Sequence, residues 1–165
     1  MRFRHHVLVL VLGLVAVMAA GSTIASTFLK VDINDLKKMS EAVVHGKVLE
    51  VRSAWNADGT MIFTEAAIEV KGHLYGKSDD LLVVRTVGGT VDDYTVEMGG
   101  APRFTKGEEI VAFIGRWKDG TPMVAGYAEG ISRVKKDNLG HLVLNGGLAD
   151  GLPVSELARQ LRQSR

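Results

Sequence analysis

The sequence predicts a mainly β domain, a small barrel of six to seven short strands between a short N-terminal helix and a C-terminal helix. Short runs rich in β-branched side chains recur along the chain and are separated by turn residues. The chain has 19 glycines among 165 residues, enough to supply both the turns and bends within strands. A helical period occurs only in two segments that flank the strands, which argues against a sheet whose strands alternate with long helices.

The first 25 residues are typical of a secretory signal peptide. Arg2 and Arg4 precede residues 7–20, which lack any polar side chain, and small or polar residues follow. This pattern predicts cleavage between residues 20 and 26. A membrane-spanning helix needs about 20 apolar residues, so an uncleaved N-terminal anchor is the alternative if the apolar run extends to Ala25.

Residues 26–165 form one domain in this interpretation, and we expect it in the periplasm, at the cell surface or outside the cell. Residues 1–25 hold two of the 20 basic side chains and no acidic one, so 18 basic and 19 acidic side chains remain. This near balance, with the basic residues spread thinly, argues against nucleic-acid binding. The chain has no cysteine, which excludes disulfides, thiolate metal sites and a cysteine nucleophile.

The first expected element is a short helix within residues 32–42. Leu36, Met39 and Val43 recur at a spacing of three to four residues, and Asp32 or Asn34 can cap the start of the helix. We expect the apolar side chains of this helix to face the core.

A long strand over residues 43–52 follows, because this run is rich in β-branched residues. Gly46 within it predicts a bulge or a sharp bend. Residues 56–59, Asn-Ala-Asp-Gly, predict a turn. Residues 62–71 then alternate between apolar and charged side chains, so one face of this strand belongs to the core and the other to solvent.

Five further strands are expected, and bent, glycine-containing strands favour a barrel of the oligonucleotide/oligosaccharide-binding type (OB-fold) over a flat sandwich, which is the alternative. Gly126 and Gly130 predict bends in the strand expected over residues 123–134. The turn at residues 137–140 predicts that this strand pairs with the next one, residues 141–144. The five strands are residues 80–87, 94–98, 109–115, 123–134 and 141–144.

Residues 152–161 predict a C-terminal amphipathic helix. Leu157, Ala158 and Leu161 share one helical face, which we expect to point inward. Ser155 or Asp150 can cap the start of this helix.

The candidate metal ligands are three histidines. His45, His73 and His141 are the only histidines of residues 26–165, and no two of them are close in the sequence. A metal site built from them would need three separate elements to converge, so we expect no metal and no cofactor.

Two common motifs of catalytic and phosphate-binding sites are absent. The chain lacks a Gly-x-Ser-x-Gly elbow and a complete Gly-x-x-x-x-Gly-Lys-Ser/Thr phosphate loop. The acidic pairs Asp79–Asp80 and Asp92–Asp93 are better explained as turn residues than as calcium ligands, because calcium loops place their oxygens at alternate positions. The alternative is a hydrolase or lyase whose site is assembled from separated residues, namely His45, Asp92, Asp93 and Glu108.

Residues 87–104 are the most distinctive segment. A loop carried on a β scaffold is a common recognition site, and this one contains side chains of types that anchor interfaces. We name as candidate binding residues Asp92, Asp93, Tyr94, Arg103 and Phe104. The alternative is a hairpin that folds over one end of the barrel, with Phe104 filling the core.

Several short motifs between residues 36 and 134 resemble those of a family of exported bacterial proteins without an established activity. The resemblance implies an exported single domain, and its motifs are Ala42-Val43-Val44-His45-Gly46-Lys47-Val48, Phe63-Thr64, Val70-Lys71-Gly72, Gly88-Gly89, Gly100-Ala101-Pro102-Arg103-Phe104 and Gly107-Glu108-Glu109.

The same motifs more distantly resemble the netrin-like module shared with the tissue inhibitors of metalloproteinases, which is a barrel of the oligonucleotide/oligosaccharide-binding type. The resemblance implies scaffold roles for Lys47, Lys71, Gly72, Gly107 and Glu108. Those inhibitors chelate the protease zinc through an N-terminal cysteine and brace the barrel with disulfides. This chain has no cysteine, so that mechanism is excluded.

Taken together, these patterns predict an exported, non-enzymatic binding or interaction domain whose partner is an exported or envelope protein. The alternatives are the hydrolase described above and an N-terminally anchored envelope protein, which would contact the membrane only through its uncleaved N-terminal segment.

Overall fold

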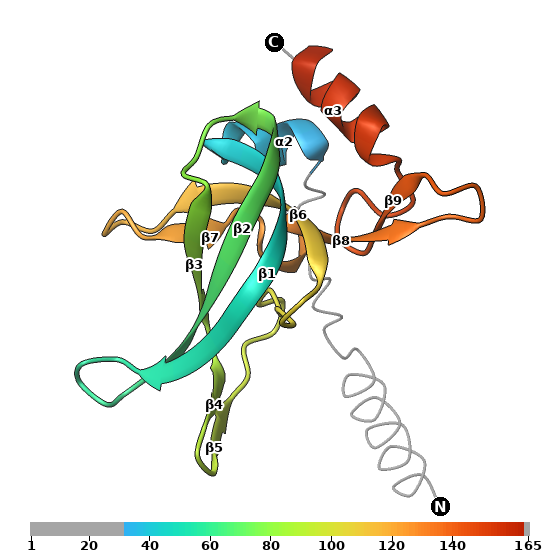
Figure 1. Cartoon of the computed structure of the whole chain (residues 1–165). Coiled ribbons are helices and arrows are strands. Elements are labelled where there is room, and N and C mark those ends of the chain that lie inside the picture. The colour runs from blue at the N-terminus through green and yellow to red at the C-terminus, as the bar shows by residue number, and fades with distance from the viewer. Residues whose placement is uncertain (1–31, 164–165) are drawn as a thin grey trace, which may run out of the picture. The chain divides into compact units, whose positions relative to one another are not determined.

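The computed structural model describes residues 32–163 (Figure 1). The expected signal segment, residues 1–25, lies outside the described residues. In the described part, no helix is both long and apolar enough to cross a membrane. The elements in chain order are α2 (Ile33–Lys38), β1 (Ala42–Trp55), β2 (Ile62–Gly76), β3 (Leu81–Val87), β4 (Gly89–Val91), β5 (Tyr94–Val96), β6 (Glu109–Arg116), β7 (Pro122–Val124), the 3₁₀ helix η1 (Tyr127–Gly130), β8 (Ile131–Lys136), β9 (Leu142–Asn145) and α3 (Val154–Gln163).

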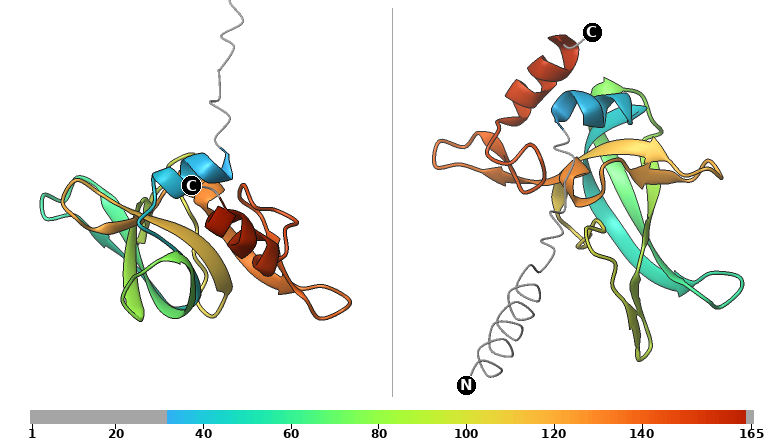
Figure 2. Two further views of the ribbon diagram at one scale, coloured as in Figure 1. Left: turned by 90° about the horizontal axis from the view of Figure 1, so that it is seen from above. Right: turned by 180° about the vertical axis from the view of Figure 1, so that it is seen from behind.

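The domain is mainly β, as predicted. A seven-stranded antiparallel sheet has the order β3-β2-β1-β6-β8-β9, and β7 pairs with β6 beside this path. Strands β4 and β5 form a separate hairpin. Seen from above, β1, β2, β3 and β6 curl around one another, whereas the β8–β9 hairpin and α3 lie to one side (Figure 2).

The strands do not close into a barrel. The ladder of paired strands runs from β3 to β9 and does not return to its start. Strand β7 lies beside β3 without pairing to it, and the indole Nε1 of Trp117 donates instead to the carbonyl of Arg85 on β3 (3.3 Å). Strand β7 has only three residues and begins with Pro122, which has no backbone N–H to donate. The predicted mainly β class is therefore confirmed, but the strands do not form a closed barrel.

Strand β1 bends at Gly46, as predicted. Its register against β2 shifts between His45 and Gly46. A Cβ atom at Gly46 would lie 2.6 Å from Cγ2 of Ile68 and 2.7 Å from the carbonyl oxygen of Glu69, so only glycine fits this close approach of β1 to β2. The bend lets one long strand pair with β6 over its first half and continue beside β2 to the turn that joins β1 to β2.

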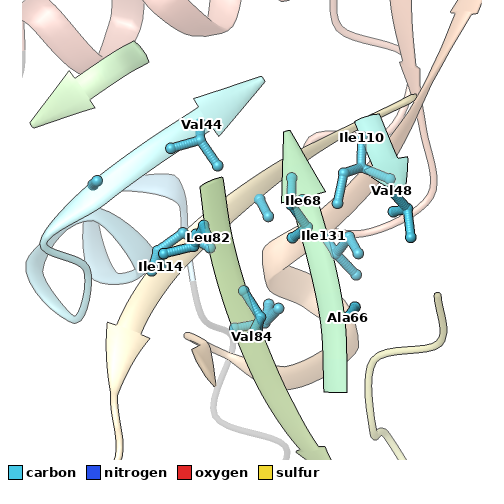
Figure 3. Close-up of a cluster of buried hydrophobic side chains, with 12 residues drawn as sticks. Val44, Val48, Ala66, Ile68, Leu82, Val84, Ile110, Ile114 and Ile131 are labelled. Atoms are coloured by element: carbon cyan, nitrogen blue, oxygen red, sulfur yellow. The ribbon is translucent and has the colours of Figure 1, made fainter. Parts of the chain in front are cut away.

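Two apolar clusters lie on opposite faces of β1 and β6. The inner cluster fills the space between the curled strands (Figure 3), and its largest members are Val44, Val48, Ile68, Leu82, Val84, Ile110, Ile114, Val124 and Ile131. The outer cluster lies beneath α2 and α3 and contains Leu36, Val43, Val111, Phe113, Leu144, Leu157 and Leu161. Successive residues of β1 and β6 alternate between the two clusters, which explains why β6 is buried along almost its whole length.

Both predicted helices are present, with shifted boundaries. Asp32 caps α2: it accepts a hydrogen bond from the backbone N–H of Asp35 (2.8 Å), and a capping box is formed. Helix α3 begins at Val154, so Ser155 lies inside its first turn rather than at its cap. Asp150 instead accepts a hydrogen bond from the backbone N–H of Gly146 (2.7 Å). Neither predicted cap of α3 is correct.

The strand expected over residues 123–134 is divided. Strand β7 ends at Val124, the chain turns through η1, and β8 begins at Ile131. Gly126 adopts a φ of 71° and Tyr127 a φ of 56°, both in the left-handed region, which no extended strand contains. Strand β4 was not expected, because it is only three residues long and starts with Gly89.

Candidate functional site

The β4–β5 hairpin and the β1–β2 turn project from the same end of the sheet (Figure 1). We call this end, made of residues 53–64 and 86–104, the hairpin end. Gly88 and Gly89 have φ values of 93° and 139°, and they let the chain turn from β3 onto the sheet. A Cβ atom at Gly89 would lie 2.4 Å from the hydroxyl oxygens of Ser53 and Thr64, so the hairpin passes directly over β1 and β2.

A cavity of about 270 Å³ lies beneath this hairpin. Hydroxyl groups form part of its lining: Ser53 and Thr64 are hydrogen-bonded (2.8 Å), and Thr64 Oγ1 donates to the carbonyl of Gly88 (2.7 Å). Because the Thr64 proton is committed to Gly88, Ser53 must be the donor in the first bond. These hydroxyls therefore fasten the hairpin to the sheet.

Trp55 and Tyr94 form an aromatic pair at the hairpin end. Their ring centroids are 5.7 Å apart at an interplanar angle of 70°, an edge-to-face contact. Tyr94 is 65% exposed and Trp55 is 39% exposed, so much of this pair faces solvent. The sequence singled out Tyr94 but not Trp55, which ends the regular part of β1 and meets Tyr94 only through the fold.

The other candidate binding residues have different surroundings. Asp92 and Asp93 form the exposed tip of the hairpin, and Asp92 has a φ of 52°, which aspartate tolerates better than most residues. Arg103 is exposed and donates to Glu97 (3.0 Å). Phe104 is half-buried: it lines the cavity and packs against the inner cluster. Four of the five candidates are therefore on the surface, and Phe104 mainly supports the core.

The hairpin end is acidic. Residues 56–61 and 88–98 contain Asp58, Asp92, Asp93 and Glu97 and no lysine or arginine. Of these four carboxylates, Glu97 is paired, with Arg103. Negative charge and exposed aromatic rings thus occur together.

The residues of the hydrolase alternative are not brought together. Gly89 lies against Ser53, which is eight residues along β1 from His45, or roughly 25 Å at the ~3.3 Å rise per residue of a strand. Asp92 and Asp93 lie farther along the hairpin. Glu108 accepts hydrogen bonds from the backbone N–H of Thr105 (2.7 Å) and from Arg133 Nε (2.9 Å), contacts that fix a loop.

A second concave surface contains all three histidines of residues 26–165. His45, His73 and His141 line one groove of about 670 Å³ between β2, the β8–β9 turn and the start of α3, which we call the histidine groove. No sequence pattern indicates that they share a groove, because the three residues come from three separate segments. Among residues 32–163, no three metal-binding side chains are close enough together to hold one ion.

Comparison of the chain with protein-family models, with curated proteins and with solved structures finds no match. The two resemblances noted in the sequence therefore remain predictions. The function has to be inferred from the geometry of the hairpin end.

Proposed function

We propose that this protein is an exported, non-enzymatic binding module that holds an exported or envelope protein at its hairpin end. The observation that carries the proposal is the exposed edge-to-face pair of Trp55 and Tyr94. Tryptophan and tyrosine are enriched among the residues that dominate protein interfaces, because they offer a large contact area with few rotatable bonds.

The charge of the hairpin end specifies the partner further. Exposed carboxylates at Asp58, Asp92 and Asp93 lie in the two turns that carry the aromatic pair. A protein surface with lysine or arginine around an apolar depression is complementary to this arrangement, and the charges would speed its association. The partner is therefore a protein with a basic, partly apolar docking surface.

The proposal includes the type of fold, an opened barrel of the oligonucleotide/oligosaccharide-binding type related to the netrin-like modules. Three features support it. Strands β1, β2 and β3 form a meander, β6 returns to pair with β1, and β7 lies beside β3. In such barrels the loops at one end carry the binding residues, as the hairpin end does in this proposal.

Export is the remaining part of the proposal, and it rests on the apolar segment of residues 7–20 behind Arg2 and Arg4. Cleavage would release the domain, and an uncleaved segment would tether it to a membrane surface. Both forms place the hairpin end where exported proteins are found.

Site-specific photo-crosslinking in the producing cell tests the proposal. A photoreactive amino acid replaces Tyr94, and in a control protein it replaces Leu139, which is 80% exposed at the β8–β9 turn. We expect one partner protein to be crosslinked from position 94 and not from position 139. In a second arm, binding of that purified partner should weaken at least tenfold in Trp55→Ala, while Leu139→Ala binds like the wild type.

Two results would overturn the proposal. One is the same set of crosslinked proteins from positions 94 and 139, which would indicate random collisions. The other is unchanged partner binding by a Trp55→Ala protein that keeps the thermal unfolding midpoint of the wild type.

A further inference from the structure

Strand β3 is the last strand at one end of the seven-stranded sheet, so one of its edges has no neighbour in the ladder. At the start of β3, the backbone N–H of Val70 donates to the carbonyl of Asp80 (2.8 Å), and just beyond its end the N–H of Gly88 donates to β2 (2.8 Å). Hydrogen-bonded pairs of an antiparallel ladder recur at every second residue, so the even-numbered residues of β3 direct their backbone groups toward β2. The backbone groups of the odd-numbered residues therefore point away from the sheet.

Only part of this outward edge is covered. The carbonyl of Arg85 accepts the hydrogen bond from Nε1 of Trp117 (3.3 Å), which brings the turn between β6 and β7 beside it. The backbone groups of Leu81 and Val83 have no such partner among residues 32–163. The free stretch of the edge is therefore residues 81–83, and it ends where the β6–β7 turn meets Arg85.

The side chains of this stretch are apolar and exposed. Leu81 is 57% exposed and Val83 is 43% exposed, whereas their neighbours Leu82 and Val84 point inward and are buried. Residues 81–84 include no charged residue and no proline, the residue types with which proteins keep a sheet edge from pairing. This edge is therefore suited to pair with another strand.

The opposite edge of the sheet, on β9, is covered by the segment that precedes α3. The backbone N–H of Leu144 donates to the carbonyl of Leu152, and the N–H of Gly151 donates to the carbonyl of Leu144 (both 2.8 Å). Val143 forms a bridge with Pro153, which has no N–H to offer to a further strand. The fold thus protects one end of the sheet and leaves the start of β3 open at the other.

We propose that two copies of this protein form a dimer in which the free edges of β3 pair with each other. When a two-fold axis joins two identical strand edges into one sheet, the strands run antiparallel. Pairing through an exposed edge is a common way for β proteins to associate. The dimer contact would extend the sheet of one copy directly into the sheet of the other.

The register of the pairing follows from which backbone groups are free. Leu81 of each copy lies opposite Val83 of the other, and these two pairs form about four backbone hydrogen bonds. A register centred on Val83 would need the backbone of Arg85, which Trp117 already engages. In the proposed register, the exposed leucines and valines of both copies lie together on one face of the joined sheet.

The charges at the two ends of β3 favour a second copy as the occupant of its edge. Asp79 and Asp80 precede the free stretch, and Arg85 follows it. In the proposed register, Asp79 of one copy lies opposite Arg85 of the other, whereas a parallel pairing would bring like charges together. Within its own copy, Arg85 donates to Glu65 through Nε and Nη2, and its Nη1 lies 3.7 Å from Asp119. A guanidinium has five N–H donors, so donors remain for a further carboxylate.

This pairing is self-limiting and leaves the hairpin ends accessible. It uses the free edge of both copies, so no open β3 edge remains for a third. The hairpin ends follow the other end of β3, and the antiparallel orientation directs them away from each other. The dimer would therefore present two hairpin ends, and its formation does not depend on what they bind.

Two measurements on the protein purified from the producing cell test the proposal. Sedimentation velocity at rising concentration should show a monomer that converts to a dimer, because a contact this short gives a weak interface. Amide hydrogen exchange should slow at Leu81 and Val83 as the dimer forms, because their N–H groups become bonded. Exchange at Leu139, on the exposed β8–β9 turn, should not change with concentration.

Two variants with matched controls locate the contact. Val83→Lys places a charge on the free edge and should weaken dimerisation at least tenfold, whereas Leu139→Lys, the same kind of change at a leucine that is 80% exposed, should dimerise like the wild type. Asp79→Arg should weaken dimerisation at least threefold, whereas Asp58→Arg, at an exposed carboxylate of the β1–β2 turn, should not. Thermal unfolding shows whether each variant keeps the fold, and Asp79→Arg, in a loop, serves as the test if Val83→Lys does not fold.

The proposal is overturned if the wild type stays monomeric at millimolar concentration, a result that would leave the edge to a strand of another protein. It is equally overturned if a folded Val83→Lys protein or the Asp79→Arg protein dimerises like the wild type. Slower exchange on other strands, with Leu81 and Val83 unchanged, would also contradict it, because the dimer contact would then lie elsewhere.

Discussion

Gly46 and Gly72 lie on neighbouring strands and have opposite surroundings. Substitution of Gly46 forces a Cβ atom to within 2.7 Å of the backbone of Glu69, whereas a Cβ atom at Gly72 meets open space. We expect Gly46→Ala to lower the free energy of unfolding by about 1–3 kcal/mol, as overpacking does. Gly72→Ala should leave it unchanged or raise it slightly, because glycine weakens a strand. Urea unfolding of the two variants makes this comparison, and equal losses would contradict it.

Glu109 predicts how stability depends on acid. Its pKa in the folded protein is below the ordinary value of 4.5, first because of the hydrogen bond from Lys71. A carboxyl group with a lowered folded pKa stabilises the protein above its unfolded pKa, and this contribution is lost as the pH falls through the folded pKa. Both side chains are more than a third exposed, so we expect no more than about 1 kcal/mol.

The variant Lys71→Met isolates this contribution. It should unfold at a lower urea concentration than the wild type at pH 7, and the difference should shrink below pH 4.5. The control is Glu65→Gln, which removes a different surface ion pair, the one between Glu65 and Arg85. A difference between Lys71→Met and the wild type that stays constant from pH 7 to pH 3.5 would contradict the assignment.

Single residues were predictable from the sequence where their role is local. The bend at Gly46 follows from a glycine inside a β-branched run, and the cap at Asp32 follows from its place before a helical period. The aromatic pair of Trp55 and Tyr94 and the presence of three histidines along one groove depend on how residues far apart in the chain are brought together. No local pattern encodes such contacts.

At the scale of elements, the sequence failed where a turn interrupts an extended run. The strand expected over residues 123–134 contains Gly130, at which a Cβ atom would lie 1.8 Å from the carbonyl oxygen of Ala125. The chain therefore folds tightly back on itself between β7 and β8. Its apolar residues suit either one long strand or two short ones, so composition alone could not separate the two cases.

Helix α3 is held by burial rather than by a cap. Leu157 and Leu161 are fully buried in the outer cluster, and the predicted cap residues do not cap the helix. We expect Leu157→Ala to lower the free energy of unfolding by about 2–5 kcal/mol because it leaves a cavity. Urea unfolding measures the loss, and Leu139→Ala, a leucine that is 80% exposed, should change it little. Similar losses in both variants would contradict the role of the outer cluster.

At the scale of the whole molecule, the opening of the sheet between β3 and β7 is bridged by Trp117. Its Nε1 donates to the carbonyl of Arg85, and its ring lies among residues of β3 and β7. We expect Trp117→Phe, which keeps an aromatic ring but loses this hydrogen bond, to increase amide hydrogen exchange in β3 and β7 by several-fold. Exchange in β8 and β9, at the far side of the sheet, is the internal control. A uniform increase across all strands would indicate general destabilisation instead.

The mainly β class was predictable because alternation and glycine content are properties of the whole sequence. Closure of a barrel could not be predicted in this way, since it depends on whether the strand that lies beside the free edge of the sheet has enough backbone donors to complete the ladder. Here that strand is β7, with three residues and Pro122 among them. The position of β7 beside β3 is a long-range contact, so it could not be predicted from these residues alone.

The contact between α2 and α3, near the two ends of the described residues, has a consequence for the order of events during synthesis. Nζ of Lys37 in α2 donates to the carbonyl of Leu161 near the end of α3 (2.7 Å), and the outer cluster needs Leu36 as well as Leu157 and Leu161. Residues near both ends of the described chain must thus be present before this cluster can form. A nascent chain that still lacks α3 therefore has an incomplete core, and in the export that we propose this would help to keep the chain unfolded until synthesis is complete.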